Sequence, residues 1–289
     1  MTQISNLIKD NRRITLRELE EETGISKTMI GNIIREDLGL KKTSAKFIPR
    51  FLTNEQKLCR LETCENMLEM TRTDPEWKDK IITGDETWVY GYDPETKRQS
   101  TEWRGQGEPR HKKSRIFKSK NKVMLVTFLD NKGIVHHEYI PEGTTVNKEV
   151  YLAILRNLRE AIRKKRPEKW ANGDWILHHD NARVHTAHLI TRFVAKNRIE
   201  ILPQPPYSPD IAPNDFFLFP KLKSALKGRK FDTRNDIIEK SLAALKAIPM
   251  DAYKNCFDNW EKRWHRCVEA GGITLKSFNK LFLCIVFFL

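Results

Sequence analysis

The segment from Asp174 to Phe219 constrains the fold of this chain more than any other part of the sequence. Residues 175–177 form a short apolar run after a Gly-Asp turn pair, which is typical of a buried strand. Residues 199–202 are predicted to form a second short buried strand, and the segment between the two, 186–196, has apolar residues at helical spacing. The segment is therefore predicted to fold as strand, helix, strand, with its two strands side by side in one sheet.

Two aspartates follow these strands. Asp180 comes at the end of the first strand, and a proline-rich loop after the second strand leads to Asp215. Both carboxylates are expected at one end of the sheet, where they suit hard cations that prefer oxygen ligands. The alternative is that each aspartate only ends a turn or caps a helix. We prefer that alternative for Asp174 and Asp210, and the other two need a third acid to form a site.

A third acid lies in the segment Ile81–Tyr90, which reads as a strand with Asp85 and Glu86 in its middle. An acid inside an apolar strand costs free energy unless it has a partner or a metal. Because side chains alternate between the two faces of a strand, one of these two acids can face solvent, but not both. The strand therefore supplies a candidate for the third carboxylate.

The charge of the chain indicates its partner. The 289 residues are enough for one core and a small extra domain, and 52 Lys and Arg against 38 Asp and Glu give a net charge of +14. This excess favours a polyanion, most simply nucleic acid, and a membrane surface is the weaker alternative. Five cysteines without C-x-x-C spacing favour a reducing compartment over a disulfide scaffold or a zinc ribbon. The N-terminus lacks the pattern of a signal peptide.

Residues 1–42 are predicted to form a helix-turn-helix module. Thr15 and Glu18 match a capping box, Gly24 ends that helix, and Gly39 ends the next. The second helix is expected to begin at Ser26 and to turn four apolar residues inward, namely Met29, Ile30, Ile33 and Ile34. Its exposed face would contact the major groove of DNA through Ser26, Lys27, Thr28 and Asn32. The alternative is an ordinary helical hairpin.

Residues 43–78 are predicted to form an extended linker, FIPRF, and a helix at 53–70 that packs on the core or on a second copy of the chain. Residues 104–122 are strongly basic and lack apolar periodicity, so they are predicted to form a loop or arm. Such a run is usually a solvated surface, but here it also suits contact with phosphates. The candidate DNA contacts in this arm are Lys112, Lys113, Arg115 and Lys118.

The remaining segments complete an α/β domain at 79–272. A hairpin is predicted at 123–129 and 134–140, then a helix at 150–166 whose basic end suits phosphate contact or nuclear import. Helices are also predicted at 220–229, 233–247 and 251–270. The end of the chain, 273–289, finishes in an apolar run far shorter than the roughly 20 residues that span a bilayer. We expect a docked or disordered tail, or a non-native terminus.

This order of elements predicts an RNase H-like mixed sheet flanked by helices. Asp85, Asp180 and Asp215 would then form a DDD triad able to bind two Mg²⁺ ions, with Mn²⁺ as a substitute. Such a pair of ions suits phosphodiester chemistry, because negative charge develops on both the attacking and the leaving oxygen. We expect His179 or Asn181 to orient a ligand or a phosphate. A zinc site from His178, His179 and His185 is disfavoured, because no fourth soft ligand lies at usable spacing.

Three blocks of the sequence resemble the signature motifs of mariner-family transposases. They are TGDETWVY, HHDNARVHTA and YSPDIAPNDFFLF, and the resemblance covers roughly residues 14–272. The family has 34 residues between its second and third acids, and Asp180 and Asp215 enclose 34 residues here. The first acid of the family pattern falls on Asp85. The mariner portion of fusions between a SET methyltransferase and a transposase is similar, but no SET module is present.

The resemblance implies an Mg²⁺-dependent transposase and endonuclease of the cut-and-paste type. It would act in the nucleus as a homodimer on double-stranded DNA, recognise inverted repeats at the transposon ends, and integrate at TA sites. FIPRF resembles the linker motif associated with dimer contacts, and the basic arm lies where the family has a clamp loop.

Three departures from the family pattern support a second hypothesis. Residues 1–42 supply only the second of the usual two helix-turn-helix units, Val184 replaces a proline, and the tail from Ile273 does not match. These features resemble a shortened genomic copy. The alternative function is therefore a DNA-binding remnant of a mariner element without catalysis.

Overall fold

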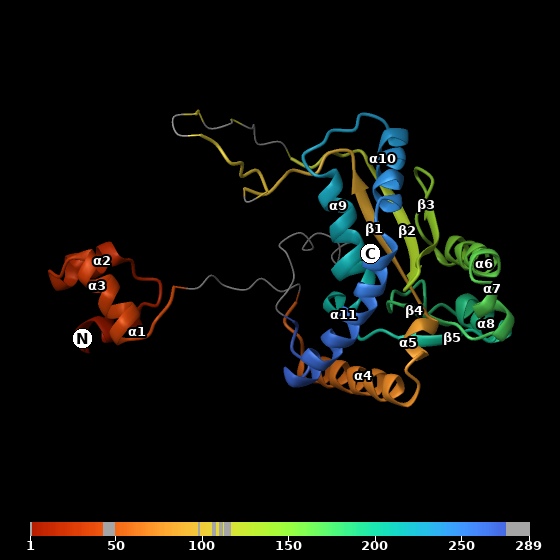
Figure 1. The fold of residues 1–289 in the computed structure, drawn as a ribbon, viewed down its shortest axis with the longest axis horizontal. Helices are drawn as coiled ribbons and strands as arrows, with labels where there is room; N and C mark the ends of the chain where they lie inside the picture. Colours follow the sequence, from red (N-terminus) through yellow and green to blue (C-terminus); the bar gives the residue numbers. More distant parts are fainter. Residues whose placement is uncertain are drawn as a thin grey trace. The chain divides into compact units, whose positions relative to one another are not determined.

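The computed structural model describes residues 2–42, 50–97, 99–105, 108–109, 112 and 117–275. The chain divides into two compact units, Met1–Phe47 and Ile48–Leu289. Figure 1 shows the helices of the first unit and the sheet and helices of the second. Within the described residues, no helix combines the length and the apolar character needed to cross a membrane.

The first unit is the predicted helical module. Its elements are α1 (Thr2–Asp10), α2 (Leu16–Thr23), α3 (Lys27–Asn32) and a wide π-type turn, η1 (Ile33–Asp37). The predicted capping box is present, because Thr15 and Glu18 exchange side-chain-to-backbone hydrogen bonds. Gly24 ends α2 with a φ of 69°, a left-handed conformation that favours glycine. Ser26 stands at the start of α3 but makes no side-chain capping bond.

The small core of this unit corrects one prediction. Ile4, Leu19 and Ile30 form its buried centre, and Ile33 and Ile34 pack against them. Met29 was predicted to point inward, but it is 59% exposed. Successive residues of a helix point about 100° apart, so Met29 and Ile30 cannot both face so narrow a core.

The second unit is built on a mixed five-stranded sheet in the order β3-β2-β1-β4-β5. The strands are β1 (Ile81–Tyr90), β2 (Lys122–Asp130), β3 (Gly133–Tyr139), β4 (Ile176–His179) and β5 (Glu200–Pro203). β1, β2 and β3 are antiparallel neighbours, whereas β4 runs parallel to β1 and to β5. The strand-helix-strand unit and the hairpin predicted from the sequence are therefore both present. The second strand of the unit was predicted to be buried, but β5 lies at the edge of the sheet and is only half-buried at Ile201 and Leu202.

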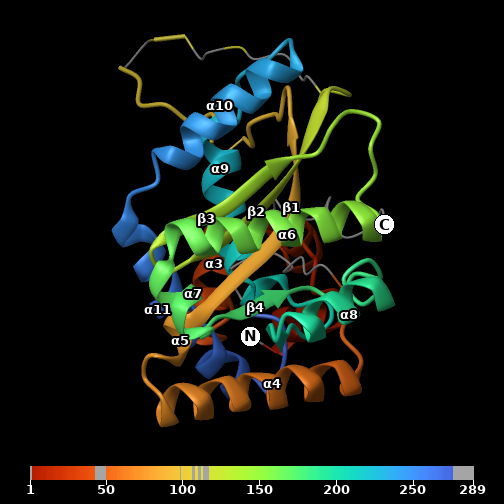
Figure 2. The same ribbon diagram turned by 90° about the vertical axis from the view of Figure 1, so that its right-hand side faces the viewer.

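Helices cover both faces of this sheet (Figures 1 and 2). The helical elements are α4 (Asn54–Thr73), α5 (Trp77–Lys80), α6 (Lys148–Lys165), α7 (Pro167–Asn172), α8 (His188–Lys196), η2 (Pro209–Ile211), η3 (Asn214–Leu218), α9 (Phe219–Leu226), α10 (Arg234–Lys246) and α11 (Met250–Glu269). One face packs against α6 and α8, where Ile82 meets Leu155 and Ile190 in one cluster. The other face packs against α9, α10 and α11, where Ile81 and Trp260 share the larger core. α4 packs along α11, so it belongs to this unit.

Gly84 lies in β1 directly before Asp85, where the chain has no room for a side chain. It pairs with Phe128 across the ladder, and a Cβ built on Gly84 would lie 2.3 Å from the Phe128 ring. Gly84→Ala is expected to destabilise the protein by about 1–3 kcal/mol, because the ring or the strand must shift. Urea unfolding measures this loss. In a double-mutant cycle with Phe128→Leu, the two changes should not add, and a strictly additive cycle would contradict the close approach as the cause.

Candidate active site

Asp85 lies in the middle of β1, and β4 continues the same register toward it. Thr83 pairs with His178 in the parallel ladder. Asp85 lies two residues further along β1, and Asp180 comes directly after the end of β4. Because alternate residues of a strand share a face, Asp85 points to the face that also bears Thr83. The sheet thus brings together two acids that are far apart in the sequence.

Asp215 reaches the same place through β2. Asp85 pairs with Thr127 across the antiparallel ladder, and the Thr127 hydroxyl donates a hydrogen bond of 3.2 Å to the side-chain oxygen of Asn214. Asn214 begins η3, and Asp215 follows it directly. The proline-rich loop therefore delivers the third acid beside the strand of the first.

The three carboxyl groups influence one another electrostatically. The pKa of Asp85 is raised well above its ordinary value by burial, and then by the negative charges of Asp215 and Asp180. Burial raises the pKa of Asp215 to about 8; Lys223 lowers it, while Asp180 contributes to the rise. The pKa values of Asp85 and Asp215 are thus raised, and a bound cation would lower them.

Asp180 differs from the other two because a histidine is bound to it. Burial alone would raise the pKa of Asp180, but a hydrogen bond from His185 and the charge of that ring bring it below its ordinary value. His185 Nδ1 lies 2.8 Å from Asp180 Oδ1, and its Nε2 lies 3.4 Å from Glu86 Oε1. These two carboxylates outweigh the burial of the ring and raise the pKa of His185 to about 10. His185 is therefore a buried cation.

Glu86 resolves the question of the two adjacent acids in β1. Glu86 and Asp85 are both partly buried, so neither is a simple solvent-facing residue. They point to opposite faces of the sheet, where Asp85 meets the other aspartates and Glu86 meets His185. Tyr151 of α6 stacks on the His185 ring at 4.0 Å between centroids and fixes it from behind. The sequence analysis did not identify Glu86, Tyr151 or His185 as parts of this site.

The three histidines considered as a zinc site do not converge as ligands. His178 Nδ1 lies 2.8 Å from the Thr83 hydroxyl on one face of the sheet. His179 Nδ1 lies 2.7 Å from the Tyr151 hydroxyl on the other face. Burial lowers the pKa of each of these two rings to about 3, so both are neutral. His179 lines up with His185 as a stacked ring and supports it.

Asp210 corrects the prediction that it is only a turn residue. Its side chain is fully buried, and it accepts two hydrogen bonds from the Arg60 guanidinium of α4, at 2.8 and 2.7 Å. Its Oδ2 also accepts a bond of 2.7 Å from the backbone of Leu275. Asp210 therefore ties the loop before Asp215 to α4 and to the segment after α11. Asp174, by contrast, is exposed after the αL turn at Gly173, as predicted.

The predicted DNA contacts are accessible where the structure describes them. Ser26, Lys27, Thr28 and Asn32 are all exposed at the start and along the outer side of α3. Lys112 is exposed in the basic arm. Lys118 is exposed too, and its Nζ lies 4.7 Å from the centre of the Tyr90 ring. Lys113, Arg115 and residues 47–49 of the FIPRF segment lie outside the described residues.

The donors present suit a divalent cation. Asp85, Asp180 and Asp215 supply only carboxylate oxygens, and two of them have raised pKa values that a nearby positive ion would lower. Across the described part of the chain, no three His, Cys, Asp or Glu side chains converge closely enough to hold a metal ion as they stand. To bind a metal ion, Asp180 would have to give up its contact with His185.

Comparison with known proteins shows which proteins this chain resembles. Residues 93–172 match the family described as a transposase with a partial DDE domain. The chain is 28% identical over 271 residues to the mariner Mos1 transposase of Drosophila mauritiana, which covers 93% of this chain and 77% of that protein. The chain is thus similar to a mariner transposase along most of its length. It is also 28% identical to the human histone-lysine N-methyltransferase SETMAR, over 93% of this chain and 39% of that protein.

Solved structures of Mos1 share the fold of this chain. A pre-cleavage Mos1 transpososome superposes with a TM-score of 0.81 at 28% identity, covering 95% of this chain and 79% of that one. A Mos1 paired-end complex with Mg gives a TM-score of 0.80 at 28% identity, covering 94% and 78%. The predicted RNase H-like sheet flanked by helices is confirmed.

Proposed function

We propose that this chain is a cut-and-paste DNA transposase whose chemistry depends on a divalent metal. One observation supports the proposal: strands β1 and β4 and the turn η3 bring the three aspartates near enough that the charges of Asp215 and Asp180 raise the pKa of Asp85. The likeness to Mos1, which has been seen in a paired-end complex with Mg, supports this proposal. The proposed reaction is strand cleavage at transposon ends and strand transfer into TA sites.

The three aspartates would hold Mg²⁺ or Mn²⁺, and bound ions would stabilise the attacking and leaving oxygens of a phosphodiester. Residues around the three aspartates set their charge and position before any metal binds. Without a cation, Asp215 keeps its proton at neutral pH because its pKa is about 8. His185 holds Asp180 in place from one side while Glu86 and Tyr151 hold His185. His185 is thus a positioning residue for the triad.

DNA is the proposed partner, and its contacts are proposed for two places. The exposed residues at the start of α3 would enter the major groove, as in other helix-turn-helix proteins. Lys112 and Lys118, with Lys113 and Arg115, would contact phosphates from the basic arm. The Mos1 structures that resemble this chain include paired-end complexes. We accordingly propose a homodimer on two DNA ends, and the nucleus as the compartment.

Metal dependence tests the enzymatic proposal directly. Purified protein is expected to nick supercoiled plasmid DNA in the presence of Mg²⁺ or Mn²⁺ and not in the presence of EDTA. Either metal should also raise the melting temperature without DNA, because a ligand that binds only the folded state stabilises it. Tight DNA binding with no nicking in either metal, and no shift in melting temperature, would leave only the binding function.

One observation favours the alternative of a DNA-binding remnant without catalysis. The described residues contain no three converging metal ligands, and the carboxylate of Asp180 is already bonded to His185. In that case the α3 contacts would account for the function, and the acids would be inert. Isothermal titration with Mg²⁺ separates the two functions, because the remnant would give no saturable binding that depends on Asp180.

A further inference from the structure

A cavity of about 370 Å³ opens on the second unit, and none of the three aspartates lines it. It lies between the turn of the β2-β3 hairpin, the end of α6, the end of α10 and the start of α11. Its lining residues are Lys132, Gly133, Ile134, His137, Lys165, Leu242, Leu245, Lys246, Ile248, Met250 and Tyr253. Three lysines and a histidine thus surround an apolar interior, and no acid belongs to the lining.

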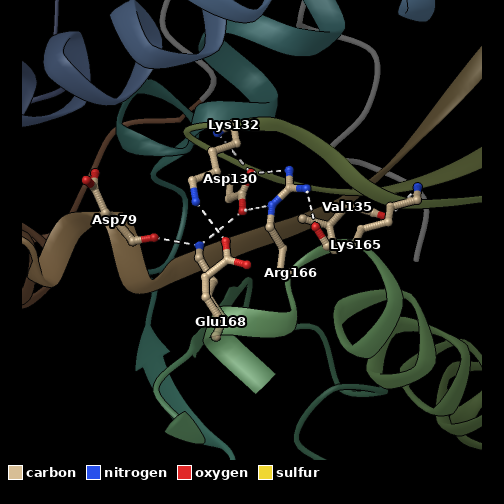
Figure 3. A network of polar contacts seen from close by, with 8 residues as sticks. Asp79, Asp130, Lys132, Val135, Lys165, Arg166 and Glu168 are labelled. Carbon is tan, nitrogen blue, oxygen red and sulfur yellow. Dashed lines mark hydrogen bonds and ion pairs between the residues drawn. The ribbon is translucent and has the colours of Figure 1, made fainter. Parts of the chain in front are cut away.

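Two acids near this wall, Asp130 and Glu168, are already paired with cations (Figure 3). Glu138, next to His137, lies 2.7 Å from His136 Nε2. Asp130 is fully buried at the end of β2, where Arg166 Nε lies at 2.7 Å and Lys169 Nζ at 3.0 Å from the same oxygen. Glu168 pairs with Lys132, with 2.7 Å between Nζ and Oε1. Neither acid can therefore balance the other cations of the cavity.

Two lysines remain with unsatisfied charge. Lys165 Nζ donates to the backbone oxygen of Val135 at 2.8 Å, which is a neutral partner. Lys246 is exposed and forms no ion pair with any residue that the structure describes. The pKa of His137 is lowered by burial and then by the positive charges of His136, Lys165 and Lys246. The cavity therefore carries a positive field that an incoming anion would relieve.

The interior of the cavity is suited to an apolar group. Leu245 and Tyr253 are almost completely buried and form part of the floor, and Ile134 packs against the same core. Met250 is 68% exposed at the rim, although methionine is an apolar residue. This volume is near the lower limit for ligand pockets. The cavity therefore suits one inserted side chain better than a longer stretch of peptide.

We propose that this cavity is a docking site for an acidic peptide segment of a partner protein that inserts one aromatic side chain between Lys165 and Lys246. Aromatic anchors in desolvated pockets dominate such interfaces, and surrounding charges of opposite sign steer the encounter. Duplex DNA fits the lysines but has no group to fill the apolar floor. The inference does not rest on the proposed transposase activity.

A fluorescein-labelled five-residue peptide tests the proposal, with phenylalanine at its centre and two acids on each side. Fluorescence anisotropy with the full chain should show saturable binding. The double variant Lys165→Glu/Lys246→Glu should bind about tenfold more weakly or worse, because two attractions become repulsions. The matched control is Lys164→Glu/Lys240→Glu, which reverses two lysines on the same helices that do not line the cavity. It should leave the affinity within about twofold.

The apolar part of the proposal has its own test. Met250→Ser should weaken peptide binding several-fold, and Met70→Ser, at another exposed methionine on α4, should not. Equal binding of a peptide with alanine in place of phenylalanine, or equal losses in the control pair, would overturn the proposal in favour of general attraction to a cationic surface. Cavity-dependent binding of phenyl phosphate without peptide binding would overturn it as well, since the site would then take a small anion. Melting curves verify that each variant is folded.

Discussion

Asp180→Ala is expected to abolish metal-dependent DNA nicking by the purified protein. The register of β1 and β4 places Asp180 next to Asp85 at the centre of the candidate site. Loss of one preorganised electrostatic group at a reacting phosphate costs roughly 10²–10³-fold in rate, and loss of a metal ligand should cost at least as much. The measurement is conversion of supercoiled plasmid to nicked circles in Mg²⁺ and in Mn²⁺.

Asp174→Ala is the matched control for this result. Asp174 lies just before β4, and its side chain is 46% exposed and paired only with Lys80 at the surface. This variant should nick DNA like the wild type, because exposed ion pairs contribute little. Both variants should bind DNA equally in a gel-shift assay. Equal nicking by wild type and Asp180→Ala would refute the catalytic role of the triad.

Asp215→Asn extends the argument from activity to stability. The pKa of Asp215 is raised to about 8, chiefly by burial, with the charge of Asp180 adding to the rise. The amide resembles the protonated acid that Asp215 is at neutral pH without a cation, but it cannot ionise to bind one. Nicking should therefore be lost while the melting temperature without metal stays equal or rises. A strongly lowered melting temperature would mean that loss of activity reports unfolding and not a lost ligand.

The strands and the placement of Asp85 near Asp180 could be predicted because they follow from local patterns. Apolar runs and turn residues located β1 and β4, and the acids at Asp85 and Asp180 stood out against those runs. Parallel neighbours in a sheet then bring residues together whatever their distance along the chain. The apolar pattern of β1 and β4 is therefore sufficient to predict that Asp85 and Asp180 lie near each other.

The partners behind the triad were not predictable because they depend on tertiary contacts. His185 lies 3.4 Å from Glu86. An acid in an apolar strand needs a partner, but the sequence does not show that this partner is His185. Arg60 and Asp210 are separated by 150 positions, and α4 shows no clear apolar side from which the burial of Arg60 would follow. Asp210 was interpreted as a turn residue for the same reason. A turn accounts for an aspartate without any tertiary contact, so the local sequence gives no sign of Arg60 as its partner.

Arg60→Met is expected to cause a large loss of stability. Arg60 and Asp210 are both fully buried, and the guanidinium also donates a bond of 2.8 Å to the backbone oxygen of Gly272. Methionine fills similar space but leaves the Asp210 carboxylate buried without the guanidinium that donates two hydrogen bonds to it. Breaking such a pair costs about 3–5 kcal/mol, which lowers the melting temperature of a domain of this size by roughly 6–20 °C.

Arg72→Met is the matched control on the same helix. Arg72 pairs with Glu69 at 2.8 Å, but their side chains are 78% and 58% exposed, so the loss should be about 0.5 kcal/mol or less. The double variant Arg60→Met/Asp210→Leu should recover much of the stability, because it removes the uncompensated charge along with its partner. If Arg60→Met melted no lower than Arg72→Met, the buried pair would not hold the loop before Asp215. If the double variant were as stable as the wild type yet no longer nicked DNA, the pair would serve to place Asp215 and not to stabilise the fold.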